Sequence, residues 1–282
     1  MSKKPIWESD MQAGDNNVKS YPRISAKKLR GLCRTGEFSG PTSGLASGHV
    51  QANLMIVPRE YAFDFLLFCQ RNPKPCPLVE VLEAGLFEAQ CAPGSDIRTD
   101  LGAYRIYEHG QLKKEVSDIR HIWDTCGPDG LVSFLLGCSF SFETALVEAG
   151  IPLRHIQQKK NVAMYRTSIP CVPAGRFSGN MVVSMRPVKS RDIARAVEVS
   201  ARYPRVHGAP VHIGNPAALG IRDLALPDYG DAVDIAEDEL PVFWACGVTP
   251  QYVAELSKLP FCISHAPGKM FVTDLLTDDM CN

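Results

Sequence analysis

The sequence predicts a mixed α+β protein, with mixed sheets and flanking helices in one compact body. Segments typical of strands and of helices alternate irregularly, and an early hairpin signal argues against a doubly wound nucleotide-binding fold. The chain has 282 residues, 45% of them apolar, which is enough to bury roughly three quarters of the unfolded surface. We expect a mobile tail over residues 1–20 and a single domain over 21–282, within which a subdomain break near 150–175 stays open.

The N-terminal half begins with a helix, because Ser25 is a good N-cap residue ahead of a short periodic segment. Four glycines then fall between positions 36 and 48, and small side chains there would let backbone amides approach a ligand. A plain surface loop is the alternative for this stretch. In chain order we expect a helix over 26–33, the loop over 36–48, a strand over 50–57, a buried helix over 59–69 stopped by prolines, and a hairpin over 104–116.

The C-terminal half contains further start and stop signals of the same kind. Ser141 is placed to cap a helix that ends at Gly150, and Thr249 followed by Pro250 is typical of a helix start. In chain order we expect a capped turn over 131–136, a helix over 142–148, a strand over 180–185, an amphipathic helix over 190–203, a strand over 241–246, a helix over 249–257 and a strand over 270–275.

Charge and hydropathy exclude two classes of partner. Lys and Arg number 30 against 31 Asp and Glu, so the clustered basic surplus needed for nucleic-acid binding is missing. The sequence has no run of about 18 apolar residues that could cross a membrane, and the N-terminus has no signal-like apolar region. We therefore expect a cytoplasmic protein with a small-molecule substrate, and a homodimer stays open.

Several familiar sites are absent from the sequence. The ten cysteines contain no C-x-x-C pair, which argues against a disulfide scaffold and a structural zinc site. The phosphate-binding loop G-x-x-x-x-G-K-[ST], the dinucleotide motif G-x-G-x-x-G and the metalloprotease motif H-E-x-x-H are missing. Residues 137–141 resemble a nucleophile elbow around Ser139 but end in serine rather than glycine. We expect neither a cofactor nor a metal.

Histidines in loops rich in proline and glycine are the first catalytic candidates. His207 and His212 lie in such a loop together with Arg205, and His265 lies in another with Lys269. Histidine exchanges protons near neutral pH, and Arg205 and Lys269 carry positive charges that suit a carboxylate. A structural role for each histidine is the alternative.

Four further residues complete the candidate set. Glu143 lies in the first turn of a predicted helix, and Asn180 and Arg186 lie at the two ends of a predicted strand. Cys246 precedes a helix start, whose positive end would stabilise a thiolate and whose amides can hold a carboxylate. Helix capping, a surface ion pair and buried packing are the alternatives for Glu143, Arg186 and Cys246.

Five sequence blocks together resemble the D-glutamate cyclase family, whose bacterial members are commonly labelled as hydro-lyases. The similarity covers roughly residues 20–276, and the end of the chain at Asn282 resembles the stand-alone microbial form. It implies a carbon–oxygen lyase of amino-acid metabolism that dehydrates D-glutamate to 5-oxo-D-proline. The blocks are GCSFSFE at 137–143, FSGNMVVSMRP at 177–187, RVHGAPVHIG at 205–214, FWACGVTPQ at 243–251 and SHAPGKMFVTD at 264–274.

The chemistry of that reaction distributes roles among the candidates. We expect His207 or His212 to act as the base and His265 or Glu143 as the acid, with Asn180 orienting the substrate. Arg186, Arg205 and Lys269 would neutralise carboxylates, and Cys246 would line the same site. These groups must then converge in one cationic cleft.

Two other classes of protein stay open. One is a metal-assisted hydratase or dehydratase of another small acid, with His207, His212 and Glu143 as ligands. The other is a carboxylate-binding protein without catalytic activity.

Overall fold

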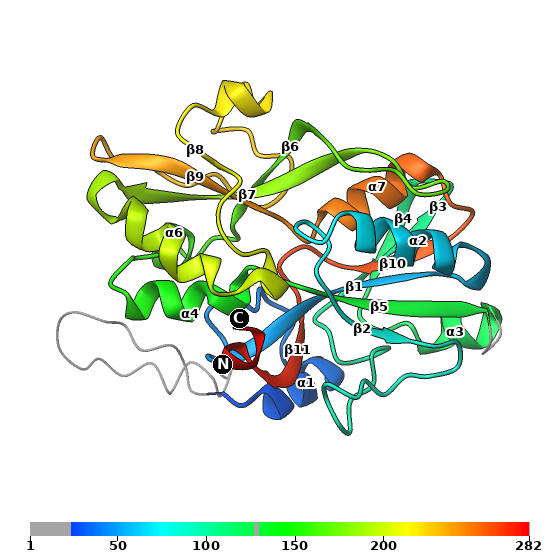
Figure 1. Cartoon of the computed structure of the whole chain (residues 1–282). Coiled ribbons are helices and arrows are strands. Elements are labelled where there is room, and N and C mark those ends of the chain that lie inside the picture. Colours follow the sequence, from blue (N-terminus) through cyan, green and yellow to red (C-terminus); the bar gives the residue numbers. More distant parts are fainter. Residues whose placement is uncertain (1–23, 127–129, 282) are drawn as a thin grey trace, which may run out of the picture.

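The computed structural model describes residues 24–126 and 130–281, and it confirms the α+β class (Figure 1). Two sheets, of seven and four strands, carry helices on their faces, and every strand pairing in the described part is antiparallel. The tail expected over residues 1–20 lies outside the described residues. Within the described ranges, none of the helices has the length and hydropathy needed to span a bilayer.

The larger sheet has the strand order β2-β5-β1-β10-β3-β4, and β11 pairs with β1 as well. All seven residues of β5 are buried, because β1 and β2 flank it on both sides. The expected turn over 131–136 is therefore wrong, and these residues form most of this strand. The strands are β1 (His49–Pro58), β2 (Leu78–Leu82), β3 (Tyr104–Glu108), β4 (Gln111–Val116), β5 (Leu131–Gly137), β10 (Cys262–His265) and β11 (Phe271–Leu276).

The smaller sheet has the strand order β6-β7-β9-β8. Directly paired residues point to the same face of an antiparallel sheet, and successive residues point to opposite faces. Met185 pairs with Phe243, which pairs with His212, so these three share one face. Ser184 and Arg186 therefore point to the other face. The strands are β6 (Ala163–Pro170), β7 (Asn180–Lys189), β8 (His212–Ile213) and β9 (Glu239–Ala245).

The helices pack onto these sheets at defined places. Helix α1 packs on β11, α2 on β1 and β5, α4 on β1 and α6, and α7 on β7. Figure 1 shows α2 and α7 between the larger sheet and the strands of the smaller one. The helices are α1 (Ala26–Arg34), α2 (Arg59–Arg71), α3 (Arg120–Cys126), α4 (Phe140–Glu148), α5 (Arg154–Gln157), α6 (Ile193–Ala201) and α7 (Thr249–Ser257).

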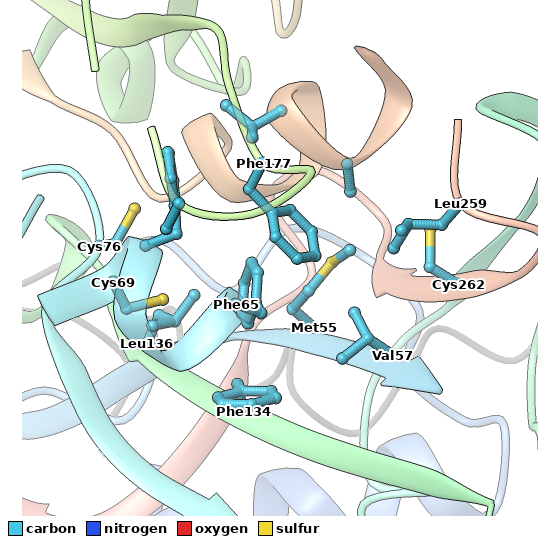
Figure 2. Close-up of a cluster of buried hydrophobic side chains, with 14 of the residues drawn as sticks. Met55, Val57, Phe65, Cys69, Cys76, Phe134, Leu136, Phe177, Leu259 and Cys262 are labelled. Atoms are coloured by element: carbon cyan, nitrogen blue, oxygen red, sulfur yellow. The ribbon is translucent and has the colours of Figure 1, made fainter. Parts of the chain in front are cut away.

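One apolar core joins α2 and α7 to the larger sheet, as Figure 2 shows. The Phe65 ring of α2 meets the Phe134 ring of β5 edge to face, with ring centroids 4.7 Å apart. The same ring lies 5.1 Å from the Phe177 ring, which arrives from the segment before β7. Such edge-to-face pairs are worth about 0.5–1.5 kcal/mol beyond the apolar area they bury. This cluster holds the two sheets in a fixed relation.

Gly137, at the end of β5, permits a close approach of two chain segments. A Cβ atom at this position would lie 2.4 Å from the carbonyl oxygen of Arg205 and 2.8 Å from the Val206 side chain. Only glycine therefore allows the 3-10 turn over Pro204–Val206 to lie against the strand end. The chain then enters α4, which places Glu143 close to the strand that carries Arg186.

Candidate active site

A buried guanidinium–carboxylate pair lies between α4 and β7. The Nη2 and Nε atoms of Arg186 donate to the same oxygen, Oε1, of Glu143, at 2.6 and 3.1 Å. Further donations from Arg186 reach the hydroxyls of Ser184 and Ser139, at 3.1 and 3.0 Å. Both members of the pair are 1% exposed. All three nitrogens of the guanidinium are thus satisfied within the protein, which is what a buried charge requires.

Two aromatic rings also flank the Arg186 guanidinium. Its central carbon lies 5.7 Å from the centroid of the Phe142 ring and 5.5 Å from that of Trp244. Both distances lie within the range of a cation–π contact. The strand, the helix and these rings hold the guanidinium in one position.

His155 and Ser43 extend the pair into a network. His155 Nε2 lies 3.0 Å from Glu143 Oε1, and the Ser43 hydroxyl donates to Glu143 Oε2 at 2.6 Å. The same hydroxyl lies 3.2 Å from His155 Nε2. His155 comes from α5, where its ring stacks on Phe140, and Ser43 comes from the glycine-rich loop. We call Ser43, Ser139, Glu143, His155, Ser184 and Arg186 the Arg186 cluster.

The pKa of Glu143 is lowered to about 2 in this environment. Burial alone would raise the pKa, but the charges of His155 and Arg186 outweigh that effect, and hydrogen bonds from His155 and Ser43 add to it. Glu143 is therefore a carboxylate at neutral pH. It can accept a proton or a hydrogen bond there, whereas the expected role of a proton donor would need a higher pKa.

Ser43 also lines a hollow in the molecular surface. This hollow has a volume of about 320 Å³ and is formed by the glycine-rich loop. Ser43 is the member of the Arg186 cluster that it reaches. The lining residues are Glu37, Phe38, Ser39, Gly40, Pro41, Ser43 and Leu45. The loop therefore connects solvent with the buried charges.

The loop that carries Ser43 is braced from two sides. Thr42 donates its backbone N–H to the carbonyl of Gly268, at 2.8 Å, and its hydroxyl to Gln51 Oε1, at 2.7 Å. The Gln51 amide donates in return to the carbonyls of Thr42 and Leu45, each at 3.0 Å. This bracing holds Ser43 against Glu143.

His207 follows Arg186 in the sequence, whereas the loop with Ser43 precedes it. The Arg186 charge acts on the His207 imidazole. Its Nδ1 lies 2.8 Å from the carbonyl oxygen of Lys74, which can only accept, so Nδ1 carries the proton. Nε2 then has a free lone pair, and it is buried without a hydrogen-bond partner among the described residues. Burial, followed by the charges of Arg186 and Lys74, lowers the pKa of His207 to about 4.

The backbone of His207 is also unusual. Its φ angle is +88°, in the left-handed region that non-glycine residues rarely adopt. Gly208 follows with φ at +66°. Strain of this kind costs about 1–3 kcal/mol and is found most often at functional sites.

Cys246 lies near the same guanidinium, at the end of β9. Burial raises the pKa of its thiol to about 11, although the Arg186 charge opposes this. It is therefore a neutral thiol at physiological pH, and the thiolate considered from the sequence does not form there.

Of the nine predicted residues, Glu143 and Arg186 are in direct contact, and the Arg186 charge acts on His207 and Cys246. The other five lie elsewhere. His212 is on the face of the smaller sheet opposite to Arg186, with its ring 5.9 Å from that of Phe243 and its Nε2 on the Asn215 carbonyl. Asn180 donates its amide to the carbonyl of Thr167, at 2.9 Å.

His265, Lys269 and Arg205 have separate surroundings. His265 contacts the backbone of Leu54 through Nδ1, and burial lowers its pKa to about 4. Lys269 forms an ion pair with Glu115, at 3.1 Å, and Arg205 is exposed. Within residues 24–126 and 130–281, no hydrogen bond or ion pair joins any of these three to the Arg186 cluster.

The donor set considered for a metal is not assembled. His207, His212 and Glu143 were its expected members, but His212 points to the other face of the smaller sheet. In the part of the chain that the structure describes, no three His, Cys, Asp or Glu side chains form a group that could hold a metal ion. The residues present there do not fit a resident metal.

His155 and Ser43 did not emerge from the sequence as site residues. Ser43 lies in the glycine-rich loop, whose composition had indicated ligand contact, so the loop but not the serine was predicted. His155 lies between Arg154 and Ile156, a context with no local sign of function. Only their approach to Glu143, from 100 and 12 positions away, reveals them.

Comparison with known proteins matches residues 132–274 to the family model described as D-glutamate cyclase. The chain is 57% identical over 265 residues to "Putative hydro-lyase" of Stutzerimonas stutzeri, covering 94% of this chain and 98% of that protein. It is 55% identical over 258 residues to "Putative hydro-lyase YcsI" of Bacillus subtilis, covering 91% and 99%.

A solved structure, that of a nitrogen repressor-like protein from Methanococcus jannaschii, aligns with a TM-score of 0.36 and 10% identity. The alignment covers 84% of this chain and 91% of that one. A score at this level does not establish a shared fold.

Proposed function

The chain belongs to the D-glutamate cyclase family, and from this membership we propose that it is a hydro-lyase that closes D-glutamate to 5-oxo-D-proline. The similar proteins named as hydro-lyases support the broader class of activity. The assignment of the substrate rests on the family model and on the chemistry of the site.

The observation that carries the proposal is the contact of the Arg186 cluster with the hollow through Ser43. A buried cation, a carboxylate and an imidazole meet there within hydrogen-bonding distance. Together they supply positive charge and two groups that can hold a proton, which is what dehydration of a carboxylic acid requires.

The proposed reaction balances without a co-reactant. The α-nitrogen of D-glutamate forms a bond to Cδ, the carbon of the γ-carboxyl group, and one carbon–oxygen bond of that group breaks. The α-ammonium gives up two protons, and both end on the departing oxygen, which leaves as water. Because the reacting groups belong to one molecule, ring closure needs no ATP to bring them together.

The residues of the site divide these tasks. His207 accepts a proton from the α-ammonium, because its Nε2 lone pair is free and its imidazole is neutral at pH 7. Arg186 offsets negative charge that develops on the γ-carboxyl group. Ser43 and His155 pass a proton to the departing oxygen, and Glu143 holds both in place.

An isotope experiment tests the reaction itself. The purified chain is incubated with D-glutamate carrying ¹⁸O on both γ-oxygens, and products are separated by chiral chromatography and weighed by mass spectrometry. We expect 5-oxo-D-proline that keeps one labelled oxygen, with little product from L-glutamate. Absence of 5-oxoproline from both enantiomers, with 5-oxo-D-proline also unchanged in the reverse assay, would overturn the proposal.

Ser43→Ala tests the site, with Ser47→Ala as the matched control from the same loop. Ser47 is exposed and contacts Thr144 rather than the Arg186 cluster. We expect Ser43→Ala to lower turnover about 10²-fold, in line with the loss of one positioned proton-transfer group, while Ser47→Ala stays at the wild-type rate. Equal rates in the two variants would remove Ser43 from the mechanism.

A further inference from the structure

A second group of charged residues lies between α7, β3 and β6. Gln251 and Glu255 are four residues apart on α7 and so share one face of the helix. That face meets Tyr107 of β3, whose hydroxyl accepts a hydrogen bond from the Gln251 amide. Arg166 of β6 approaches from the other side, with its Nη2 3.7 Å from Glu255 Oε2.

Two acceptors in this group can accept a further hydrogen bond. Oε1 of Gln251 is buried and has no hydrogen-bond partner among the residues described. Glu255 interacts with the Tyr107 hydroxyl and lies 3.4 Å from the Gln251 amide and 3.7 Å from Arg166. Burial raises the pKa of Glu255 despite these partners. Both acceptors are therefore suited to a strong N–H donor such as an ammonium group.

Two cations lie beside these acceptors. Arg105 of β3 and Lys269 share one carboxylate, Glu115 of β4, at 3.2 and 3.1 Å. The Arg105 charge also acts on Glu255 and on Tyr107, which places the guanidinium close to both. Two cations that share one anion can take up a second carboxylate.

The Arg166 guanidinium is not available to bind a ligand carboxylate, because other side chains of the protein already contact it. Its guanidinium lies 4.4 Å from the centroid of the Tyr252 ring and 5.3 Å from that of Tyr229. The Tyr229 hydroxyl accepts from it at 2.9 Å, and Asp228 lies 3.8 Å away. Arg166 therefore forms one side of the group, and its contacts hold it in a fixed position.

The hairpin turn locks this arrangement. Gly110, with φ at +78°, packs so closely that a Cβ atom would lie 2.1 Å from the carbonyl oxygen of Glu255. The backbone N–H of His109 donates to the carbonyl of Pro260, just beyond the helix. Arg105 and Tyr107 are thus held at a set distance from Glu255. The side chains of Arg105, Lys269 and Glu255 are 25%, 23% and 22% exposed, so solutes can reach them.

We propose that this group is a second binding site, which takes a small α-amino acid. Its ammonium group binds Gln251 Oε1 and the Glu255 carboxylate, and its carboxylate binds Arg105 and Lys269. The site is separate from the Arg186 cluster, since no hydrogen bond or ion pair within the described part of the chain connects the two. The inference therefore does not depend on the proposed function.

Binding of 2-aminoisobutyrate to the full chain tests the site. This amino acid has no γ-carboxylate and cannot form the five-membered ring, so its binding is separable from turnover of D-glutamate. We expect saturable binding by calorimetry, and at least tenfold weaker binding of isobutyrate and of isopropylamine, which each keep one of the two charged groups. No saturable binding of 2-aminoisobutyrate would overturn the proposal, whatever the fate of D-glutamate.

Glu255→Gln and Lys269→Met locate the ligand. Each should weaken binding of 2-aminoisobutyrate at least tenfold, and Glu198→Gln, an exposed carboxylate on α6, should leave it unchanged. Ser43→Ala should also leave it unchanged, which separates this site from the proposed active site. Wild-type affinity in both Glu255→Gln and Lys269→Met would overturn the assignment.

Gln251→Met distinguishes a ligand-binding role from a structural one. This variant removes a buried acceptor without a partner and, with it, the amide that donates to Tyr107 and Glu255. We expect at least tenfold weaker binding of 2-aminoisobutyrate, together with a modest loss of resistance to urea from the missing amide hydrogen bonds. A loss of stability with wild-type affinity would show that Gln251 has a structural role only and would overturn its part in the site.

Discussion

The two charged groups of this protein differ in how fully other residues satisfy the hydrogen bonds of their buried polar atoms. In the Arg186 cluster, every guanidinium nitrogen has a partner and the carboxylate contacts are as short as 2.6 Å. In the group around Glu255, the carboxylate lies 3.4 Å from the Gln251 amide and 3.7 Å from Arg166, and one amide oxygen has no partner within the described chain. The polar groups of the first cluster are satisfied within the protein, and Ser43 connects it to the hollow. The second group has an acceptor that a ligand would satisfy.

Arg186→Met should produce the largest effect. It leaves Glu143 charged and buried without its cation, which we expect to cost about 3–5 kcal/mol in the free energy of unfolding. Arg166→Met is the matched control, because 42% of the Arg166 side chain is exposed, and it should cost less than about 1 kcal/mol. Urea denaturation of both variants measures the contrast.

The double variant Arg186→Met with Glu143→Gln sharpens this result. Removing the stranded charge should restore part of the lost stability, since the cost of the single variant comes from the uncompensated carboxylate. Equal losses in the single and double variants would mean that packing rather than charge accounts for the effect.

The second largest expected effect is a loss of folding stability at low pH, caused by protonation of Glu143. The pKa of this carboxyl is about 2 in the folded chain against 4.5 in the unfolded chain, because His155 and Arg186 outweigh its burial. The unfolded state therefore binds the proton first as pH falls. About 3 kcal/mol of stability, complete above pH 4.5, should disappear between there and about pH 2.

Glu143→Gln removes this contribution, so the difference between its stability curve and that of the wild type isolates it. Glu255→Gln is the control from the other group. The pKa of Glu255 is raised by burial, so its contribution has the opposite sign, present at low pH and lost as pH rises. A difference curve for Glu143→Gln that is flat between pH 4.5 and 2 would contradict the prediction.

Lys269→Met should have the smallest effect on stability. Its ion pair with Glu115 is open to solvent on both sides, with 23% and 40% of the two side chains exposed. We expect a loss of about 0.2–1 kcal/mol at low ionic strength, and none in about 1 M NaCl, where screening is complete within a few ångströms. A loss that persists in salt would mean that the lysine stem contributes packing.

Several elements could be predicted because their signals are local. Ser25 caps α1, with its hydroxyl 3.3 Å from the Lys28 N–H, as its type and position indicate. The hairpin over 104–116 and the helix that starts at Thr249 are confirmed as well. Each signal acts within a few residues of the chain.

Other elements escaped prediction for physical reasons. Strands β8 and β10 have two and four residues, too few for a periodic pattern to appear. The segment that forms β5 is apolar apart from Ser133, and such a run does not distinguish a strand from a buried turn or helix. Its pairing with β1 and β2 decides the matter.

The candidate site shows the same division between local and distant causes. By itself the sequence determined the α+β class, the Ser25 cap of α1, the glycine-rich loop and the residue types capable of acid–base chemistry. The predicted caps Ser141 and Thr249 were wrong, because α4 and α7 begin at Phe140 and Thr249, after Ser139 and Val248. Only the tertiary structure decided that Arg186 meets Glu143, 43 positions away, that Ser43 meets His155, 112 positions away, and that His212 points to the opposite face. Capping and turn preferences act between neighbours, whereas the partner of a buried charge depends on which strands pair and which faces they bury.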